Sequence, residues 1–281
     1  MLRFLILSGY FELMMYLQVS GKLNQYINVH YRYLAFLSMG LSLVLALVQL
    51  TIWVKADKNG NQTEHPHEEM HDHGLQKRHQ RVIAYLLLAL PIVVGLCFPT
   101  ISLDTTIVDA KGFSLPVSKE SVGDPEMNTQ YLKPDTSIYF NKSDYTTQME
   151  KLLKEYENKD TIEITDENYL EVMELIYDYP SEFIGKKISY KGFVYRAPQG
   201  DQGDAFLFRF GIIHCVADSG VFGLLTHMPD NLNFSNDQWY HVEGTVSLEY
   251  YQPLKRELPT VTPTKITKVS APKNQYVYRS F

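Results

Sequence analysis

Three long apolar runs, separated by polar segments, dominate the first hundred residues of the chain. They cover residues 2–20, 33–54 and 82–101, and the second and third contain no charged residue. A helix needs about 20 apolar residues to cross a bilayer. The pattern therefore predicts three transmembrane helices within residues 1–101. For the first run, a signal peptide and an interfacial helix remain as alternatives.

Three residues inside these runs are candidates for contacts within the membrane. Glu12 lies near the middle of the first run, and Pro91 and Gly95 interrupt the third. A charged side chain at the centre of a span costs about 3 kcal/mol on insertion scales, so Glu12 should face protein, water or a partner. Pro91 and Gly95 predict a kinked third helix, in which Pro91 marks either a hinge or packing site or an ordinary proline of a membrane helix.

The pattern changes after residue 101. Residues 102–141 are polar and contain several prolines, which predicts an extended linker. Apolar residues at helical spacing then predict two helices, at 142–158 and about 166–178. From residue 185 onward the period becomes two, which is typical of strands. Strands are expected at 187–195, 205–216, 221–227, 239–248 and 264–269.

Five short strands with internal glycines predict a small β-barrel of the OB type with its core at residues 185–270. A fragment of a β-sandwich is the alternative. The predicted fold class is thus a membrane-anchored α+β protein. It has three N-terminal transmembrane helices, and two helices precede the C-terminal OB-like barrel in a soluble domain at 142–281.

Lysine and arginine near the ends of the apolar runs predict the orientation. The loop at 55–81 carries five basic residues, Lys55, Lys58, Lys77, Arg78 and Arg81, whereas the loop between the first two runs carries two. The 55–81 loop should therefore be cytoplasmic. With three spans in a cell membrane, the domain at 142–281 is expected to be extracytoplasmic.

The predicted cytoplasmic loop is rich in histidine. The sequence EHPHEEMHDHGLQKRH at residues 64–79 interleaves carboxylates with five imidazoles. Neutral imidazole binds zinc and other divalent transition metals, and carboxylates can complete the coordination. We therefore expect an exchangeable metal site here, although a plain polar connector remains the alternative. The candidate ligands are His65, His67, His71, His73 and His79.

A second candidate metal site follows the second predicted strand. His214 and Asp218 would share one face of a regular strand, with Cys215 on the other, so a bulge would be needed to bring all three together. His227 could add a ligand after the next strand. The alternative is that Cys215 is a small core residue and that the other two end a strand.

Composition and motifs narrow the classes of function. The net charge of −6 and the pI near 5.8 argue against nucleic-acid binding, which needs clustered basic residues. The chain has no GxSxG, HExxH or phosphate-binding glycine-rich motif. We therefore expect a non-enzymatic protein.

Several stretches together resemble the YcgQ-like family of membrane proteins. They are QYINVHYRYL, the histidine-rich loop, PIVVGLCFPTISLDTTIVDAKGF, FIGKKISYKGFVYR and FRFGIIHCVADSGVFGL. The resemblance covers essentially the whole chain and implies a multi-span permease as partner, with a link to a metal or small ion. Family members commonly carry two adjacent cysteines where this chain has His214 and Cys215, which weakens a dithiol site.

Two functions are consistent with these patterns. The first is an accessory subunit of a membrane permease for a metal ion or small solute, anchored in the bilayer by its helices. The second is a membrane sensor for metal homeostasis or envelope state that binds a ligand through its outer domain.

Overall fold

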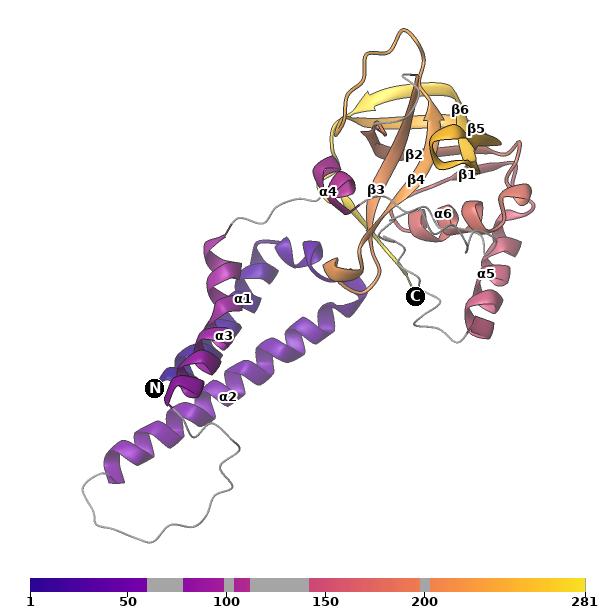
Figure 1. Cartoon of the computed structure of the whole chain (residues 1–281). Coiled ribbons are helices and arrows are strands. Elements are labelled where there is room, and N and C mark those ends of the chain that lie inside the picture. Colours follow the sequence, from indigo (N-terminus) through magenta and orange to yellow (C-terminus); the bar gives the residue numbers. More distant parts are fainter. Residues whose placement is uncertain (60–77, 99–103, 112–141, 198–202, 281) are drawn as a thin grey trace. The chain divides into compact units, whose positions relative to one another are not determined.

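The computed structural model describes residues 1–59, 78–98, 104–111, 142–197 and 203–280 (Figure 1). The chain divides into two compact units that are interleaved in sequence. The N-terminal unit comprises Met1–Asn24 and His30–Ser102, and the C-terminal unit comprises Gln25–Val29 and Leu103–Phe281. A short piece of chain between the first two helices thus belongs to the C-terminal unit.

The N-terminal unit consists of three apolar helices, α1 (Leu2–Val19), α2 (Arg32–Asn59) and α3 (Arg78–Cys97). By length and composition, each of the three could cross a membrane. Helices α2 and α3 extend beyond the apolar runs on the side of the histidine-rich loop, because the polar residues that flank these runs continue the helices.

Helix α1 packs against both of its neighbours in this unit. Its contact with α3 depends on a small residue, because a Cβ atom at Gly95 would lie 2.6 Å from a methyl carbon of Leu13. The Tyr10 hydroxyl also donates a hydrogen bond of 2.9 Å to the Leu88 carbonyl. Gly95 is therefore a packing position between α1 and α3.

The C-terminal unit combines three described helices with seven strands. The helices are α4 (Thr105–Lys111), α5 (Lys142–Tyr156) and α6 (Tyr169–Asp178). The strands are β1 (Thr161–Glu163), β2 (Lys187–Tyr195), β3 (Asp204–Ile212), β4 (Gly220–His227), β5 (Trp239–Tyr251), β6 (Arg256–Val269) and β7 (Tyr276–Tyr278).

The strands form one mixed sheet in the order β1-β2-β5-β6-β4-β3-β7. Strand β2 pairs with β5 along Lys187–Phe193, and only its last three residues, Phe193–Tyr195, also pair with β3. Short parallel strands, β1 and β7, extend the sheet at its two ends. The domain is thus a seven-stranded mixed sheet. Its five central strands return to one another only through the three-residue pairing of β2 with β3, so the sheet is not a closed barrel, and the OB type that the sequence predicted stays a prediction.

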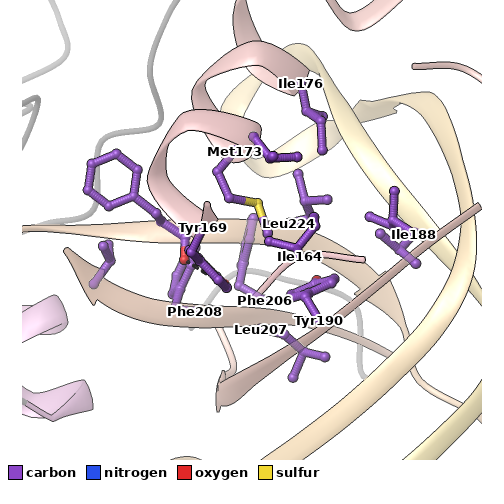
Figure 2. Packing of buried hydrophobic residues seen from close by; sticks show 14 of the residues in the cluster. Ile164, Tyr169, Met173, Ile176, Ile188, Tyr190, Phe206, Leu207, Phe208 and Leu224 are labelled. Atoms are coloured by element: carbon purple, nitrogen blue, oxygen red, sulfur yellow. Dashed lines mark hydrogen bonds between the residues drawn. The ribbon is translucent and has the colours of Figure 1, made fainter. Parts of the chain in front are cut away.

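Helix α6 supplies much of the core. All of its residues from Tyr169 to Tyr177 are buried. Figure 2 shows Tyr169, Met173 and Ile176 beside the buried side chains of the sheet. The Tyr177 hydroxyl donates to the Gly223 carbonyl over 2.8 Å, which ties the helix to β4. Gly223 must be glycine, since a Cβ atom there would lie 1.9 Å from the Leu207 carbonyl oxygen.

Several boundaries differ from those predicted. Helix α4 (Thr105–Lys111) lies inside the segment expected to be an extended linker, β5 continues to Tyr251, and β6 begins at Arg256 rather than at residue 264, because β5 and β6 pair along their whole length. Helix α6 begins at Tyr169 rather than near residue 166, because Asn168 accepts the Thr165 backbone N–H (2.7 Å) in a turn before the helix. Strand β3 ends at Ile212 and does not continue to Val216. The chain turns at this point into a short 3₁₀ helix, Val216–Asp218.

Candidate functional site

The turn that follows β3 is organised by one carboxylate. Asp218 accepts the backbone N–H of His214 (3.0 and 3.1 Å) and that of Cys215 (2.8 Å). Its Oδ2 atom also lies 2.7 Å from Nδ1 of His214. A carboxylate that accepts several backbone N–H groups fixes a tight turn, because each bond satisfies a donor that the ended strand leaves without a partner. We call residues 213–219 the His214 turn.

Cys215 takes part in the same turn. Its side chain accepts the backbone N–H of Asp218, as in a helix capping box, and its thiol is free of any disulfide. His214 and Asp218 therefore meet in a turn and not across the face of a regular strand. Within the described ranges, no group of three His, Cys, Asp or Glu side chains is arranged to hold a metal ion. A metal bound at His214, Cys215 and Asp218 stays a prediction.

The His214 turn pairs with a segment from near the start of the chain. Ile27 forms an antiparallel β-bridge with Cys215. The Asn28 N–H donates to the His214 carbonyl, and the Val216 N–H donates to the Tyr26 carbonyl, each over 2.9 Å. Residues 25–29, which we call the tether, thus complete a two-stranded contact with the turn.

The side chain of Asn28 holds the tether in place. Its amide nitrogen donates to the Ile213 carbonyl over 2.6 Å and to the Arg279 carbonyl over 2.9 Å. Asn28 is only 1 % exposed, and the partners lie 185 and 251 positions away in sequence. An asparagine amide has two N–H donors that point in different directions, so one side chain can satisfy both carbonyls. This single residue therefore joins three distant parts of the chain.

Arg279 extends the connection into the core. Its guanidinium forms a buried ion pair with Glu174 of α6, 3.2 Å between Nη2 and Oε2. The guanidinium also lies over the ring of Tyr145 on α5, 5.8 Å from its centre. In addition, the Arg279 N–H donates to the Ile212 carbonyl over 3.3 Å. The Asn28 contact is thus made to a backbone that is itself fixed by α5, α6 and β3.

His227 lies at the other end of β4. An eight-residue strand is roughly 25 Å long, and the His214 turn precedes its first residue, Gly220. The structure therefore does not bring His227 together with His214, Cys215 or Asp218.

At its own end of the sheet, His227 bridges two carboxylates. Nδ1 lies 2.7 Å from Asp204 Oδ1, and Nε2 lies 2.9 Å from Glu249 Oε2. Ser247 donates to the other oxygen of Glu249 over 2.7 Å. Partial burial alone would lower the pKa of His227, but the hydrogen bonds and negative charges of Asp204 and Glu249 outweigh it and raise that pKa above 6.5.

A hollow of about 310 Å³ adjoins this end of the sheet. Its lining includes Gly203 and Met228, the neighbours of Asp204 and His227 in sequence. Arg196 and Asp230 contribute opposite charges to the lining, and the Arg196 guanidinium stacks over the ring of Phe234 at 5.3 Å. The hollow therefore presents both charged and aromatic groups.

The remaining predicted site residues are distributed over the N-terminal unit. Glu12 is exposed on α1, Pro91 lies inside α3, and Gly95 contacts α1. His79 is exposed in the first turn of α3. His65, His67, His71 and His73 lie outside the described residues, so their role as metal ligands stays a prediction.

Sequence reasoning missed Asn28, Arg279 and Arg209. Arg209 is buried at 1 % exposure, pairs with Asp166 over 2.6 Å and stacks on Trp239. It is the single charge in the apolar stretch AFLFRFGII, and a charge in a buried strand is a recognisable signal of a required partner. Asn28 gives no comparable signal, because it lies in a polar turn.

Comparison with known proteins places both units of this chain in one family. Residues 2–114 match the DUF1980 N-terminal domain, and residues 139–279 match the DUF1980 C-terminal domain. The chain belongs to the DUF1980 family. The resemblance to YcgQ-like proteins is confirmed by UPF0703 protein YcgQ of Bacillus subtilis, which is 40 % identical to this DUF1980 protein over the full length of both chains.

A second relative comes from Streptococcus mutans. It is 48 % identical over the whole of both chains and is named "Putative two-component membrane permease complex subunit". Two of the stretches that carried the family resemblance, QYINVHYRYL and FRFGIIHCVADSGVFGL, contain the tether and the His214 turn. In this DUF1980 protein the structure therefore brings two of those stretches into direct contact.

We predict that replacing Asn28 with alanine loosens the tether. The substitution leaves the carbonyls of Ile213 and Arg279 without their donor, which should cost about 1–3 kcal/mol. Relative to the unsubstituted protein, hydrogen–deuterium exchange should rise in the peptide that contains Val216 and in the separate peptide that contains Arg279. Asn233→Ala is a matched control, because Asn233 is exposed. Equal exchange in the Asn28→Ala variant and the unsubstituted protein would contradict the assigned role.

The His227 bridge should make stability depend on pH. The raised pKa of His227 stabilises the folded state fully below 6.5, and this contribution is lost as pH rises through the folded-state value. For Glu249, burial raises the pKa, but Ser247 and His227 together lower it below 4.5, so its contribution is lost only at more acidic pH. The substitution His227→Gln should therefore lower the free energy of unfolding most between about pH 4.5 and 6.5.

Urea unfolding followed across this pH range measures the effect. The difference in unfolding free energy between the unsubstituted protein and His227→Gln should shrink above pH 6.5. Glu249→Gln removes the same contact from the other side and should give a similar profile. Parallel pH curves for all three proteins would show that the bridge does not titrate as described.

Proposed function

We propose that this chain is a non-enzymatic accessory subunit of a membrane permease complex. The observation that carries the proposal is the full-length identity of 48 % to the relative from Streptococcus mutans that bears such a name. Identity of this level over both units makes a shared role the simplest interpretation. The three apolar helices of the N-terminal unit would provide the membrane anchor.

The position of the tether supports this membrane arrangement. If α2 and α3 both cross the bilayer, residues 25–29 and the C-terminal unit must lie on the same side. Tether and domain form one compact unit, which agrees with that topology. The basic residues that flank the histidine-rich loop favour a cytoplasmic loop, and hence an extracytoplasmic domain.

The tether also suggests how the domain would act on the membrane helices. Two short connections lead from the tether, one back to α1 and one on to α2. A solute bound to the domain could change the position of the tether and thereby bias the two helices. The hollow beside Arg196 and Asp230 is the candidate binding place, since charged and aromatic groups together suit a small polar solute or ion.

A metal remains part of this proposal through the histidine-rich loop. His65, His67, His71, His73 and His79 would bind zinc or another divalent transition metal on the cytoplasmic side. The site around His214 would be a separate and weaker candidate. The alternative function, a membrane sensor for metal or envelope state, would use the same loop without a permease partner.

Affinity purification of the full-length chain from native membranes tests the proposal. We expect a multi-span permease to be recovered in stoichiometric amount, and elemental analysis of the purified complex to find zinc, nickel or copper. A variant with alanine at His65, His67, His71 and His73 should keep the permease and lose the metal. Recovery of the chain alone would contradict the subunit role and favour a sensor.

A further inference from the structure

One face of α1 carries a regular stripe of residues. Leu5, Ser8, Glu12, Met15 and Val19 follow one another at alternating spacings of three and four. At this spacing, side chains on a helix line up on a single face, as they do along the seam of a coiled coil. We call these five residues the Glu12 face.

The Glu12 face is not the face that packs within the N-terminal unit. The buried residues of α1 are Ile6, Leu13 and Leu17, which lie roughly 120° around the helix from Glu12 at about 100° per residue. On the Glu12 face, Leu5, Met15 and Val19 are 50 %, 45 % and 85 % exposed. Glu12 itself is exposed.

Glu12 has an unusual position among the charges of the apolar helices. The other charged residues of α1, α2 and α3 lie within a few positions of a helix end. Glu12 is seven residues from the nearer end of α1, or about 10 Å at 1.5 Å per residue. If α1 crosses the bilayer, a glutamate side chain at that position is too short to reach the membrane surface. Within the part of the chain that the structure describes, no hydrogen bond or ion pair involves Glu12.

We propose that the Glu12 face of α1 docks on a membrane helix of the permease partner that presents a Lys, Arg or His side chain at the same depth. The proposal rests on the permease-subunit function. Charged residues inside a membrane pair with one another or face the interior of a bundle, because lipid offers them no partner. The exposed apolar residues above and below Glu12 would pack against the same helix.

The charge of Glu12 favours a permease helix with a basic side chain over a second copy of this chain as the partner of the Glu12 face. A symmetric contact between two Glu12 faces would bring two carboxylates together in an apolar medium, where like charges repel most strongly. A basic side chain on the partner instead neutralises Glu12. The exposed faces of α2 and α3 carry no such mid-helix charge among the residues that the structure describes.

Site-specific photocrosslinking in native membranes locates the contact. A photoreactive residue at Met15 or Val19 should form an adduct with the permease, and the crosslinked peptide should lie in a span that carries a basic residue. Val44 on α2 and Val93 on α3 are control positions, since both are exposed and apolar. Adducts of equal yield from all four positions, or none from Met15 and Val19, would overturn the proposed face.

Substitution of Glu12 tests the charge. Glu12→Leu should reduce the permease recovered with the chain about tenfold, as expected for a polar contact between membrane helices. Glu12→Lys should abolish recovery, and a second exchange of the partner's basic residue to glutamate should restore it. Glu12→Asp should retain most of it.

These outcomes separate the two proposals. If the unsubstituted chain recovers no permease, the subunit function itself fails. If it recovers the permease, and the Glu12→Leu and Glu12→Lys variants recover it equally well, then the subunit function stands and docking through Glu12 is wrong.

Discussion

The hydrogen bonds of the Asn28 amide are the contact on which the tether, and the joining of distant segments within the C-terminal unit, depend. They join the segment between α1 and α2 to the carbonyls of Ile213 and Arg279, on two other segments of the C-terminal unit. Buried carbonyl groups need donors, and the tether provides one where the sheet does not. The tether lies between α1 and α2 in sequence, so these bonds hold the connection between the two helices within the C-terminal unit.

The two backbone partners of Asn28 are themselves held by further contacts. Arg279 is fixed by its ion pair with Glu174, and Ile213 by the turn that Asp218 closes. Removing one partner from a buried ion pair costs about 3–5 kcal/mol, so Glu174 and Arg279 are expected to remain paired.

Local pattern was enough to predict much of the architecture. Strand β2 occupies Lys187–Tyr195, the same residues that the period-two pattern indicated, and the three apolar helices follow from composition. Strands β1 and β7 were missed because three residues are too few to show a period. The end of β3 was missed because the apolar residues Ile213 and Val216 continue the pattern, while Asp218 turns the chain. The role of Asn28 depends on partners about two hundred positions away, which no local pattern encodes.

The most direct test of the tether is a disulfide between Ile27→Cys and the native Cys215, in a protein whose other cysteine is changed by Cys97→Ser. Directly opposed residues of an antiparallel pair have Cα atoms about 4.5–5.5 Å apart, within the range that a disulfide spans. Under mild oxidation the full-length protein should form an intramolecular disulfide, detected as a mobility shift that reductant reverses. Tyr26→Cys, whose side chain points to the other face, should not crosslink. Absence of the disulfide in the folded Ile27→Cys protein, or equal crosslinking by Tyr26→Cys, would contradict the account.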